Sequence, residues 1–531
     1  MIDRSRAVIT GSIRSRLTGQ RSRRYPPRGY RAEQYEKWFP HTATAMRRWL
    51  SKLDPPKHSP DDSPDPNAAI GFLVSPWFST PVPWYSMALA CGLARRGRHV
   101  VVYWDDLGFP QRLLDEQRQA IAEVMAVISE RVPVTRISSY GAESARGGDD
   151  ELVDRLTALN TTWALRGGTV ESDMEKARER EMHRALESTL PRVRSALRES
   201  GLESLVVPGG IAGTSGLYLA AASESSIRAA TFDVDRGVAQ ICVDGIAAQS
   251  ADIPRAFALL LEASTEVRAR AICTARDEFA LRARSTDSYG FQLVPSRTEP
   301  GEAFTAVIPM NVEWDSAALG RHIHFADTIE WITTTAAVIL EAGGTVAVRQ
   351  HPSERRQLQR SRLDMAAVLR DHFGDDNRVR FVAADDPTNS YDLLSQARVV
   401  LPFASTIGIE AAALGKTVIV AGWSCYASLG FVHNPVTRDD YLALVRRAVL
   451  TELPLLREQE DRAWLCYYLA AVRNRVVTDF TPSQDDFWQW CSRDPHTLFA
   501  EPEVADILEA LDRDVPISLL RHHRATEEAH T

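Results

Sequence analysis

Cysteine is scarce in this chain. The six cysteines among 531 residues are scattered, with no C-x-x-C pair and no spacing typical of metal ligands. A secreted disulfide scaffold and a cysteine-based zinc site are therefore excluded as organising features. The pattern is typical of a reducing compartment, so we expect a cytoplasmic protein. The cysteines are Cys91, Cys242, Cys273, Cys425, Cys466 and Cys491.

Long apolar runs, basic charge and phosphate-loop glycine motifs are also missing. No segment reaches the roughly 18 to 20 apolar residues of a membrane-spanning helix. The formal net charge of −8 argues against nucleic acid as a partner, because duplex-binding surfaces carry a basic excess. The glycine-rich stretch PGGIAGTSG (Pro208–Gly216) has neither the P-loop nor the dinucleotide-binding spacing. It is either a tight turn lining an acceptor site or a turn with no ligand role.

The start of the chain is rich in arginine. Residues 1–31 contain nine arginines and one aspartate. They lack the apolar core of a secretory signal, so export is not expected. Two interpretations remain open: a solvated tail, or a basic patch in peripheral contact with an anionic inner-membrane surface, where each charge contributes about 1 kcal/mol.

Beyond this start, apolar strands alternate with helices in two successive series. The first series begins at AAIGFLV (Ala68–Val74) and the second at AFTAVIPM (Ala303–Met310). Continuous apolar strands predict parallel sheets covered on both faces. The sequence thus predicts an α/β fold with two Rossmann-type, doubly wound domains facing a central cleft, an arrangement that resembles the GT-B glycosyltransferases. The predicted units are a basic tail with a Pro/Asp-rich linker (1–67), an acceptor domain (68–300), a donor domain (301–440) and a helical C-terminal extension (441–531).

Three loops of the second series carry polar residues where predicted strands end. His351-Pro352 follows the first of these strands, and the imidazole is suited to a phosphate or to a neighbouring carbonyl. The stretch FASTIGIEAAALGK (Phe403–Lys416) predicts a helix capped by Ser405 or Thr406. Such a helix start attracts anions, although a plain crossover helix would also carry a cap.

Other residues of these loops suit the sugar and ribose of a ligand. Gly408 has no Cβ and so leaves space for a ligand to approach the backbone. Glu410, one turn into the helix, is suited to accept hydrogen bonds from ribose hydroxyls, or else to be solvated. Tyr426, in AGWSCYASLGF (Ala421–Phe431), is suited to stack on a sugar or base, or to pack as a lid. All three loops are expected at the carboxyl edge of one sheet, which is where ligands bind to such folds.

The order of these motifs resembles the bacterial capsule polysaccharide biosynthesis proteins, which include β-Kdo transferases, and is similar to sialyl- and polysialyltransferases. The resemblance covers about residues 346–431. It implies that His351, Pro352, Ser405, Thr406, Gly408, Glu410 and Tyr426 form a nucleotide-sugar site, with a CMP-sugar favoured as donor. The matching residues are His351-Pro352, Tyr391-Asp392-Leu393 with Ala397, Ser405-Thr406-Ile407-Gly408-Ile409-Glu410-Ala411, Gly415-Lys416, and Gly422 with Tyr426.

Sugar transfer also requires a base or a nucleophile. Asp233 and Asp235, at the end of a predicted strand of the first series, are the best candidates, with His351 acting on the leaving phosphate. Asp105 and Asp106 are weaker competitors. An Asp-x-Asp metal site and a solvated turn are the alternatives for Asp233 and Asp235, and we predict neither a metal nor another cofactor.

The sequence therefore predicts a metal-independent glycosyltransferase. It would move a sugar, with Kdo or another ulosonic acid as first choice, from a nucleotide donor to a glycan or glycolipid acceptor. Two other hypotheses remain open. One is a CDP-alcohol phosphotransferase of the teichoic-acid type, and the other is a non-catalytic protein of polysaccharide assembly.

Overall fold

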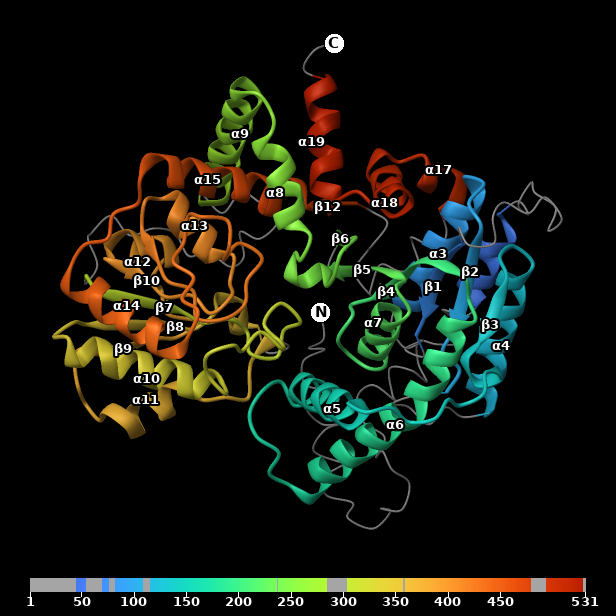
Figure 1. Cartoon of the computed structure of the whole chain (residues 1–531), viewed down its shortest axis with the longest axis horizontal. Helices are drawn as coiled ribbons and strands as arrows, with labels where there is room; N and C mark the ends of the chain where they lie inside the picture. Colours follow the sequence, from blue (N-terminus) through green and yellow to red (C-terminus); the bar gives the residue numbers. More distant parts are fainter. Residues whose placement is uncertain are drawn as a thin grey trace, which may run out of the picture.

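The computed structural model describes residues 44–53, 69–75, 82–107, 115–235, 237–283, 303–356, 359–478 and 493–528. Figure 1 shows them as two α/β halves, with the blue-to-green half built on one sheet and the yellow-to-orange half on another. The arginine-rich start and the predicted helical stretch Asp485–Trp490 lie outside the described residues.

The first half is built on a seven-stranded sheet in the order β12-β6-β5-β4-β1-β2-β3. Its parallel part shows the predicted continuous apolar strands, since all six residues of β1 are buried. The antiparallel edge made by β6 and β12 was not predicted. The strands are β1 (Ala69–Val74), β2 (Val100–Trp104), β3 (Val134–Arg136), β4 (Leu202–Pro208), β5 (Arg228–Asp235), β6 (Val238–Cys242) and β12 (Arg475–Val477).

The second half is built on a five-stranded parallel sheet in the order β11-β10-β7-β8-β9. In both sheets the first strand lies between the second and the fourth, so the strand order reverses direction beside it. This is the doubly wound arrangement, and the predicted GT-B-like α/β fold is confirmed. The strands are β7 (Ala306–Pro309), β8 (Val346–Arg349), β9 (Val379–Val382), β10 (Val399–Val400) and β11 (Thr417–Val418).

Helices cover the sheets, and several of them begin at a residue whose side chain caps the helix. The α10 helix, for example, begins after Asp327, whose carboxylate accepts a hydrogen bond from the Glu330 N–H, and ends before Gly343 in the left-handed conformation. The first half contains α3 (Val82–Arg95), α4 (Asp115–Ser129), α5 (Asp149–Leu165), α6 (Asp173–Arg198) and α7 (Ser215–Glu224). The second contains α8 (Ile253–Leu261), α9 (Thr265–Ala283), α10 (Thr328–Glu341), α11 (Met365–Phe373), α12 (Ser390–Gln396), α13 (Ile407–Ala413), α14 (Arg438–Leu450) and α15 (Arg457–Tyr467), and the chain ends with α17 (Pro495–Phe499), α18 (Pro502–Arg513) and α19 (Ile517–Glu528).

Apolar side chains pack across the predicted domain limits at three places. Residues 44–53, assigned to the tail and linker, bury Trp49 and Leu53 in the core of the first half. The α8 and α9 helices, assigned to the first domain, bury their apolar residues in a core of the second half. The extension is not a separate unit: α14 packs in the second half, whereas α18 packs in the first. Helical periodicity alone does not tell which core a helix covers.

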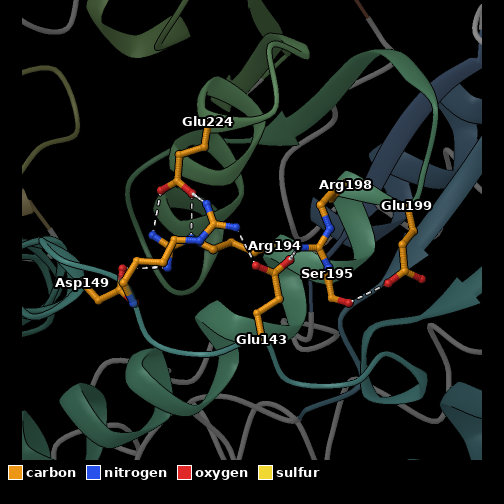
Figure 2. Close-up of polar contacts among 8 residues, drawn as sticks. Glu143, Asp149, Arg194, Ser195, Arg198, Glu199 and Glu224 are labelled. Carbon is orange, nitrogen blue, oxygen red and sulfur yellow. Dashed lines mark hydrogen bonds and ion pairs between the residues drawn. The ribbon is translucent and has the colours of Figure 1, made fainter.

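The α5–α6 hairpin is an insertion between β3 and β4. A network of ion pairs fixes its base, as Figure 2 shows. Arg194 of α6 is 5% exposed and contacts Asp149 at 2.6 Å and Glu224 of α7 at 2.7 Å. Arg198 pairs with Glu143 at 2.9 Å. Because its charge is compensated on both sides, the buried Arg194 joins α5, α6 and α7 into one block.

Two negative findings concern the described part of the chain. None of the helices seen there is both long and apolar enough to cross a membrane. Nor do its His, Cys, Asp and Glu side chains form a group of three or more that could hold a metal ion.

Candidate functional site

A pocket opens at the carboxyl edge of the second sheet, where β7 and β10 lie side by side and the strand order reverses. Ligands of doubly wound sheets bind at such a switch point. The loops after β7, β8 and β10 and the start of α12 supply most of the lining, together with Arg282 from the end of α9. The lining residues are Arg282, Pro309, Met310, Arg349, Gln350, His351, Pro352, Ser390, Tyr391, Ser405, Thr406, Ile407 and Glu410.

Arg349 places a buried positive charge in this pocket. It is 2% exposed, and its guanidinium donates to neutral oxygens: the Thr388 carbonyl at 3.2 Å, the Ala383 carbonyl and the Ser390 hydroxyl at 3.4 Å. Burial lowers the pKa of Arg349 to about 10, so the side chain stays protonated at neutral pH. Its hydrogen-bond partners are neutral, although the negative charges of Asp386 and Asp385 act on it from farther away. A buried cation hydrogen-bonded to neutral groups is suited to attract an anion into the pocket.

His351 is held in one orientation as a neutral donor. Its Nδ1 accepts a hydrogen bond from the Ser353 N–H at 3.2 Å and lies 2.7 Å from the Ser353 hydroxyl. Burial, followed by the charges of Arg349 and Arg282, lowers the pKa of His351 to about 4. The imidazole is therefore neutral at pH 7, and its proton sits on Nε2. His351 is suited to donate a hydrogen bond to phosphate but does not carry the positive charge.

Ser405 and Thr406 lie in the pocket wall at the start of α13. Thr406 is the N-cap residue but makes no side-chain capping bond, and Ser405 Oγ accepts only a long bond of 3.4 Å from Ile407 N. The predicted stop at Gly415 is confirmed by its left-handed backbone. Because α13 has only seven residues, most of the positive potential in the pocket must come from the arginines rather than from the helix.

Glu410 lines the pocket but is already engaged by protein groups. Its Oε2 accepts a hydrogen bond from Tyr391 Oη at 3.0 Å, and its Oε1 lies 3.6 Å from Arg282 Nε. Arg282 Nε also donates to Tyr391 Oη at 3.2 Å. The carboxylate is 4% exposed, so ribose hydroxyls would compete with these partners. Arg282 and Arg349 were missed from the sequence, although Arg349 immediately precedes Gln350-His351-Pro352.

Gly408 and Tyr426 do not have the places that we predicted for them. Tyr426 is 1% exposed, and its hydroxyl donates to the Ser405 carbonyl at 2.7 Å. A Cβ on Gly408 would lie 3.0 Å from Pro402 Cγ and would collide with Tyr426 Oη. Gly408 thus makes room for the buried Tyr426 side chain. The exposed aromatic residue of this loop is Trp423, which is 40% exposed and lies over the Arg321 guanidinium at 5.0 Å.

Asp233 and Asp235 lie on β5, beyond its last pair with the parallel strand β4. They pair instead with the antiparallel strand β6, Asp233 opposite Gln240 and Asp235 opposite Val238. Asp233 is partly buried, and its carboxylate accepts a hydrogen bond from the Val234 N–H at 2.8 Å. The described lining of the pocket contains neither aspartate. Their role as base or nucleophile stays a prediction.

Asp105, the weaker competitor, has the more unusual environment. It follows β2 directly, is fully buried, and accepts hydrogen bonds from Thr214 Oγ1 at 2.6 Å and from Leu107 N at 3.3 Å. Burial raises its pKa to about 6. Asp106 instead accepts a bond from the Ser138 N–H at 2.9 Å. Asp105 therefore ties the end of β2 to the turn before α7.

Replacing Asp105 by asparagine should change how stability depends on pH. With a folded-state pKa of about 6 against an ordinary 3.8, the stability contributed by Asp105 is full below pH 3.8 and is lost as pH rises through 6. Urea unfolding of D105N and wild type should show wild type losing about 2.4 kcal/mol relative to the variant between pH 4 and 7. Asp106→Asn controls for the loss of one carboxylate. Parallel pH profiles of D105N and wild type would contradict this assignment.

Comparisons with known proteins agree with the position of the pocket. The family model described as "Capsule polysaccharide biosynthesis protein" matches residues 294–449, which include β7 to β11 and most of the pocket. The resemblance to this family is confirmed. The capsule-family segment, as we call residues 294–449, holds every predicted donor residue from His351 to Tyr426. No curated protein matches the chain significantly.

Solved structures similar to this chain include glycosyltransferases and UDP-N-acetylglucosamine 2-epimerases. The β-Kdo 2,4-transferase KpsC of Thermosulfurimonas dismutans is 16% identical, with 50% of this chain and 79% of that chain covered and a TM-score of 0.33. The MnaA–UDP complex of S. aureus is 10% identical, with 78% and 93% covered and a TM-score of 0.26. A Thermobaculum terrenum O-GlcNAc transferase mutant is 14% identical, with 89% and 73% covered and a TM-score of 0.26. The fold assignment rests on the strand order of the two sheets, not on these scores.

Proposed function

We propose that this chain is a glycosyltransferase of capsule polysaccharide assembly that uses a nucleotide-activated sugar. The observation that supports this most is the pocket at the β7/β10 switch point. There a buried Arg349, held by neutral groups, stands beside a neutral His351 with a free Nε2 proton. The capsule-family segment contains both residues. Together they suit a phosphate group whose negative charge grows as a sugar leaves.

In this proposal each pocket residue has a separate task. Arg349 supplies the charge that holds the phosphate, and His351 Nε2 donates a hydrogen bond to one of its oxygens. Ser405 and Thr406 offer hydroxyls from the opposite wall. Stabilising the leaving phosphate in this way needs no metal ion, and orientation of donor and acceptor supplies much of the remaining acceleration. A CMP-linked ulosonic acid, Kdo first, stays our choice of donor.

The acceptor side is proposed from residues of both halves. Asp233 and Asp235 remain the candidate base or nucleophile. Trp423, rather than Tyr426, offers an exposed indole face to an acceptor glycan or glycolipid sugar. Its ring is held in place because Arg321 lies behind it and donates to the Gln249 carbonyl of the first half at 2.8 Å.

The test is a thermal-shift panel with CMP, CDP, UDP and GDP on wild type and His351→Ala. A nucleotide at 100 times its dissociation constant stabilises a protein by about 2.7 kcal/mol. We expect one nucleotide, CMP first, to raise the melting temperature of wild type and to have a much smaller effect on the variant. Inorganic phosphate serves as the control for binding of an anion without a nucleoside. No shift with any nucleotide would refute the proposal.

Donor turnover separates the enzyme hypotheses. Release of nucleotide from a CMP-sugar in the presence of acceptor glycan supports the transferase, whereas turnover of CDP-glycerol would favour the phosphotransferase. Nucleotide binding without any turnover, unchanged by substitution of Asp233 and Asp235, would favour the non-catalytic assembly protein.

A further inference from the structure

The α5–α6 hairpin reaches from the first half to the second. In Figure 1, α5 lies low between the two halves, whereas α8 and β12 lie at the top. The chain passes between the halves at that upper side, once between β6 and α8 and once before β12. The hairpin therefore bridges the halves on the side away from the covalent crossings.

The base of the hairpin belongs firmly to the first half. Besides the Arg194 network of Figure 2, the side chain of Asn160 on α5 exchanges two hydrogen bonds with Gly213: its Nδ2 donates to the carbonyl at 3.2 Å, and its Oδ1 accepts from the N–H at 2.6 Å. The Leu156 side chain packs where a Cβ on Gly216 would lie. The hairpin thus moves with the first half.

The tip of the hairpin contacts the second half through Arg362. The guanidinium pairs with Glu175 at 2.8 Å and with Glu171 at 3.1 Å. The Arg362 N–H also donates to the carbonyl of Arg166, the residue that ends α5, at 2.8 Å. The Arg166 guanidinium in turn lies 5.7 Å from the ring of Trp314. These contacts are polar and partly exposed, so they can be broken at a small cost in free energy.

Glu313 destabilises the contact between the hairpin tip and the second half. It comes from the loop after β7, and a Cβ on Gly167 would collide with its carboxylate. Gly167 and Gly168 both have left-handed backbones, φ +83° and +78°, which lets the turn pass close to Glu313. The Oε2 atom of Glu313 is buried without a hydrogen-bond partner among the described residues. Burial raises the pKa of this carboxyl and outweighs the opposite effect of a hydrogen bond with the Gly168 backbone. A carboxylate buried in this way costs free energy while the hairpin is docked.

We propose that the α5–α6 hairpin is a detachable clasp between the two halves, that Arg362 is its latch and that Glu313 keeps it weak. A contact that opens reversibly requires a firmly attached base, polar contacts at the tip, and a group that destabilises the closed state. An interface evolved only for rigidity would bury apolar side chains at the tip instead.

The clasp also reaches the walls of the pocket. Glu313 follows three residues after Met310, which lines the pocket. Near Arg362, the Ser361 N–H donates to Glu354 at 2.9 Å, and Glu354 in turn accepts from Gln350, the neighbour of His351, at 3.1 Å. Opening of the clasp is therefore expected to loosen both loops. The clasp itself does not depend on the proposed function, since its contacts involve no ligand.

The test is a distance measurement by single-molecule fluorescence transfer on the full chain. Dyes are attached at Glu187→Cys on α6 and Asp371→Cys on α11, both exposed, in a background with Cys273→Ser and Cys491→Ser. The latch variant is Arg362→Met. The matched control is Arg370→Met, an exposed arginine on α11 outside the clasp. Glu175→Gln removes one charge but keeps a side chain that can cap α6.

We expect Arg362→Met to raise the ratio of long-distance to short-distance molecules about three- to tenfold, and Glu175→Gln to raise it less. Glu313→Gln should lower the ratio, because it removes a buried charge. Raising the salt concentration from 50 to 500 mM should mimic Arg362→Met in wild type and change the variant little. The proposal is overturned if Arg362→Met and Arg370→Met give the same distribution as wild type, or if Glu313→Gln opens the molecule.

Discussion

Replacing His351 by asparagine should abolish most nucleotide binding while leaving the stability of the fold unchanged, whereas replacing it by glutamine should keep most of the binding and lower the stability. The two nitrogen atoms of the imidazole have different roles. Nδ1 accepts from the Ser353 N–H and so caps the short helical turn Pro352–Arg355, and Nε2 carries the proton offered to phosphate. Asparagine can replace the acceptor at the Nδ1 position, and glutamine can place an amide N–H near the Nε2 position.

The expected magnitudes are different for the two variants. A hydrogen bond to a charged group contributes about 1.5–3 kcal/mol, so His351→Asn should weaken nucleotide binding about 10- to 150-fold. His351→Gln should keep binding within a few-fold but lose about 1 kcal/mol of stability with the cap. Calorimetric titration with the nucleotide selected by the thermal-shift panel gives the first quantity, and urea unfolding gives the second.

The pH dependence of wild-type binding checks the same assignment. With a pKa of about 4, His351 stays neutral above pH 5, so its own titration should not alter binding between pH 5.5 and 8. A loss of binding centred near pH 6.5 that disappears in His351→Gln would mean that the imidazolium is the binding form. Equal losses in the asparagine and glutamine variants would mean that His351 does not contact the nucleotide.

The sequence was sufficient to predict the parallel strands and the general position of the pocket. Strands β7 to β11 are short apolar runs, and the polar residues that follow them reach one edge of the sheet because parallel strands all point the same way. His351, Ser405, Thr406 and Glu410 were predicted on this basis, and all of them line the pocket. The reasoning is geometric and needs only the strand direction.

The same reasoning could not separate residues that face the pocket from residues that support it. Lys416 belongs to the family pattern, yet its amine donates to the carbonyls of Ser395 and Ala397 and fastens the end of α12. Arg282, by contrast, faces the pocket but was not predicted. It lies on α9, far from the motif in sequence, and enters the pocket only because α9 packs against the second half. Contacts between segments that are distant in the sequence produce no local sequence pattern from which they could be predicted.

Gly408→Ala is the substitution that distinguishes a supporting glycine from a ligand-facing one. The new methyl group would collide with Tyr426 Oη and lie 3.0 Å from Pro402 Cγ. Tyr426 cannot swing away, because it is 1% exposed and its hydroxyl is bonded to the Ser405 carbonyl at 2.7 Å. Overpacking of this kind costs about 1–3 kcal/mol, which outweighs the roughly 1 kcal/mol that alanine gains over glycine in a helix. We therefore expect a lower free energy of unfolding.

Tyr426→Phe is the matched second substitution, since it removes only the hydroxyl oxygen, the atom that the methyl group meets most closely. Alone it should cost about 0.5–1.5 kcal/mol, the net value of one hydrogen bond. In the double variant the collision with Oη is gone and only the tight contacts with Tyr426 Cζ and Pro402 Cγ, both at 3.0 Å, remain. The stability lost by the double variant should therefore be smaller than the sum of the two single losses by about 1 kcal/mol in a double-mutant cycle. If Gly408 instead gave a ligand access, Gly408→Ala would keep its stability, lose nucleotide binding, and gain nothing from Tyr426→Phe. Measured in urea and by nucleotide titration, the two outcomes do not overlap, because only a packing role couples Gly408 to the Tyr426 hydroxyl.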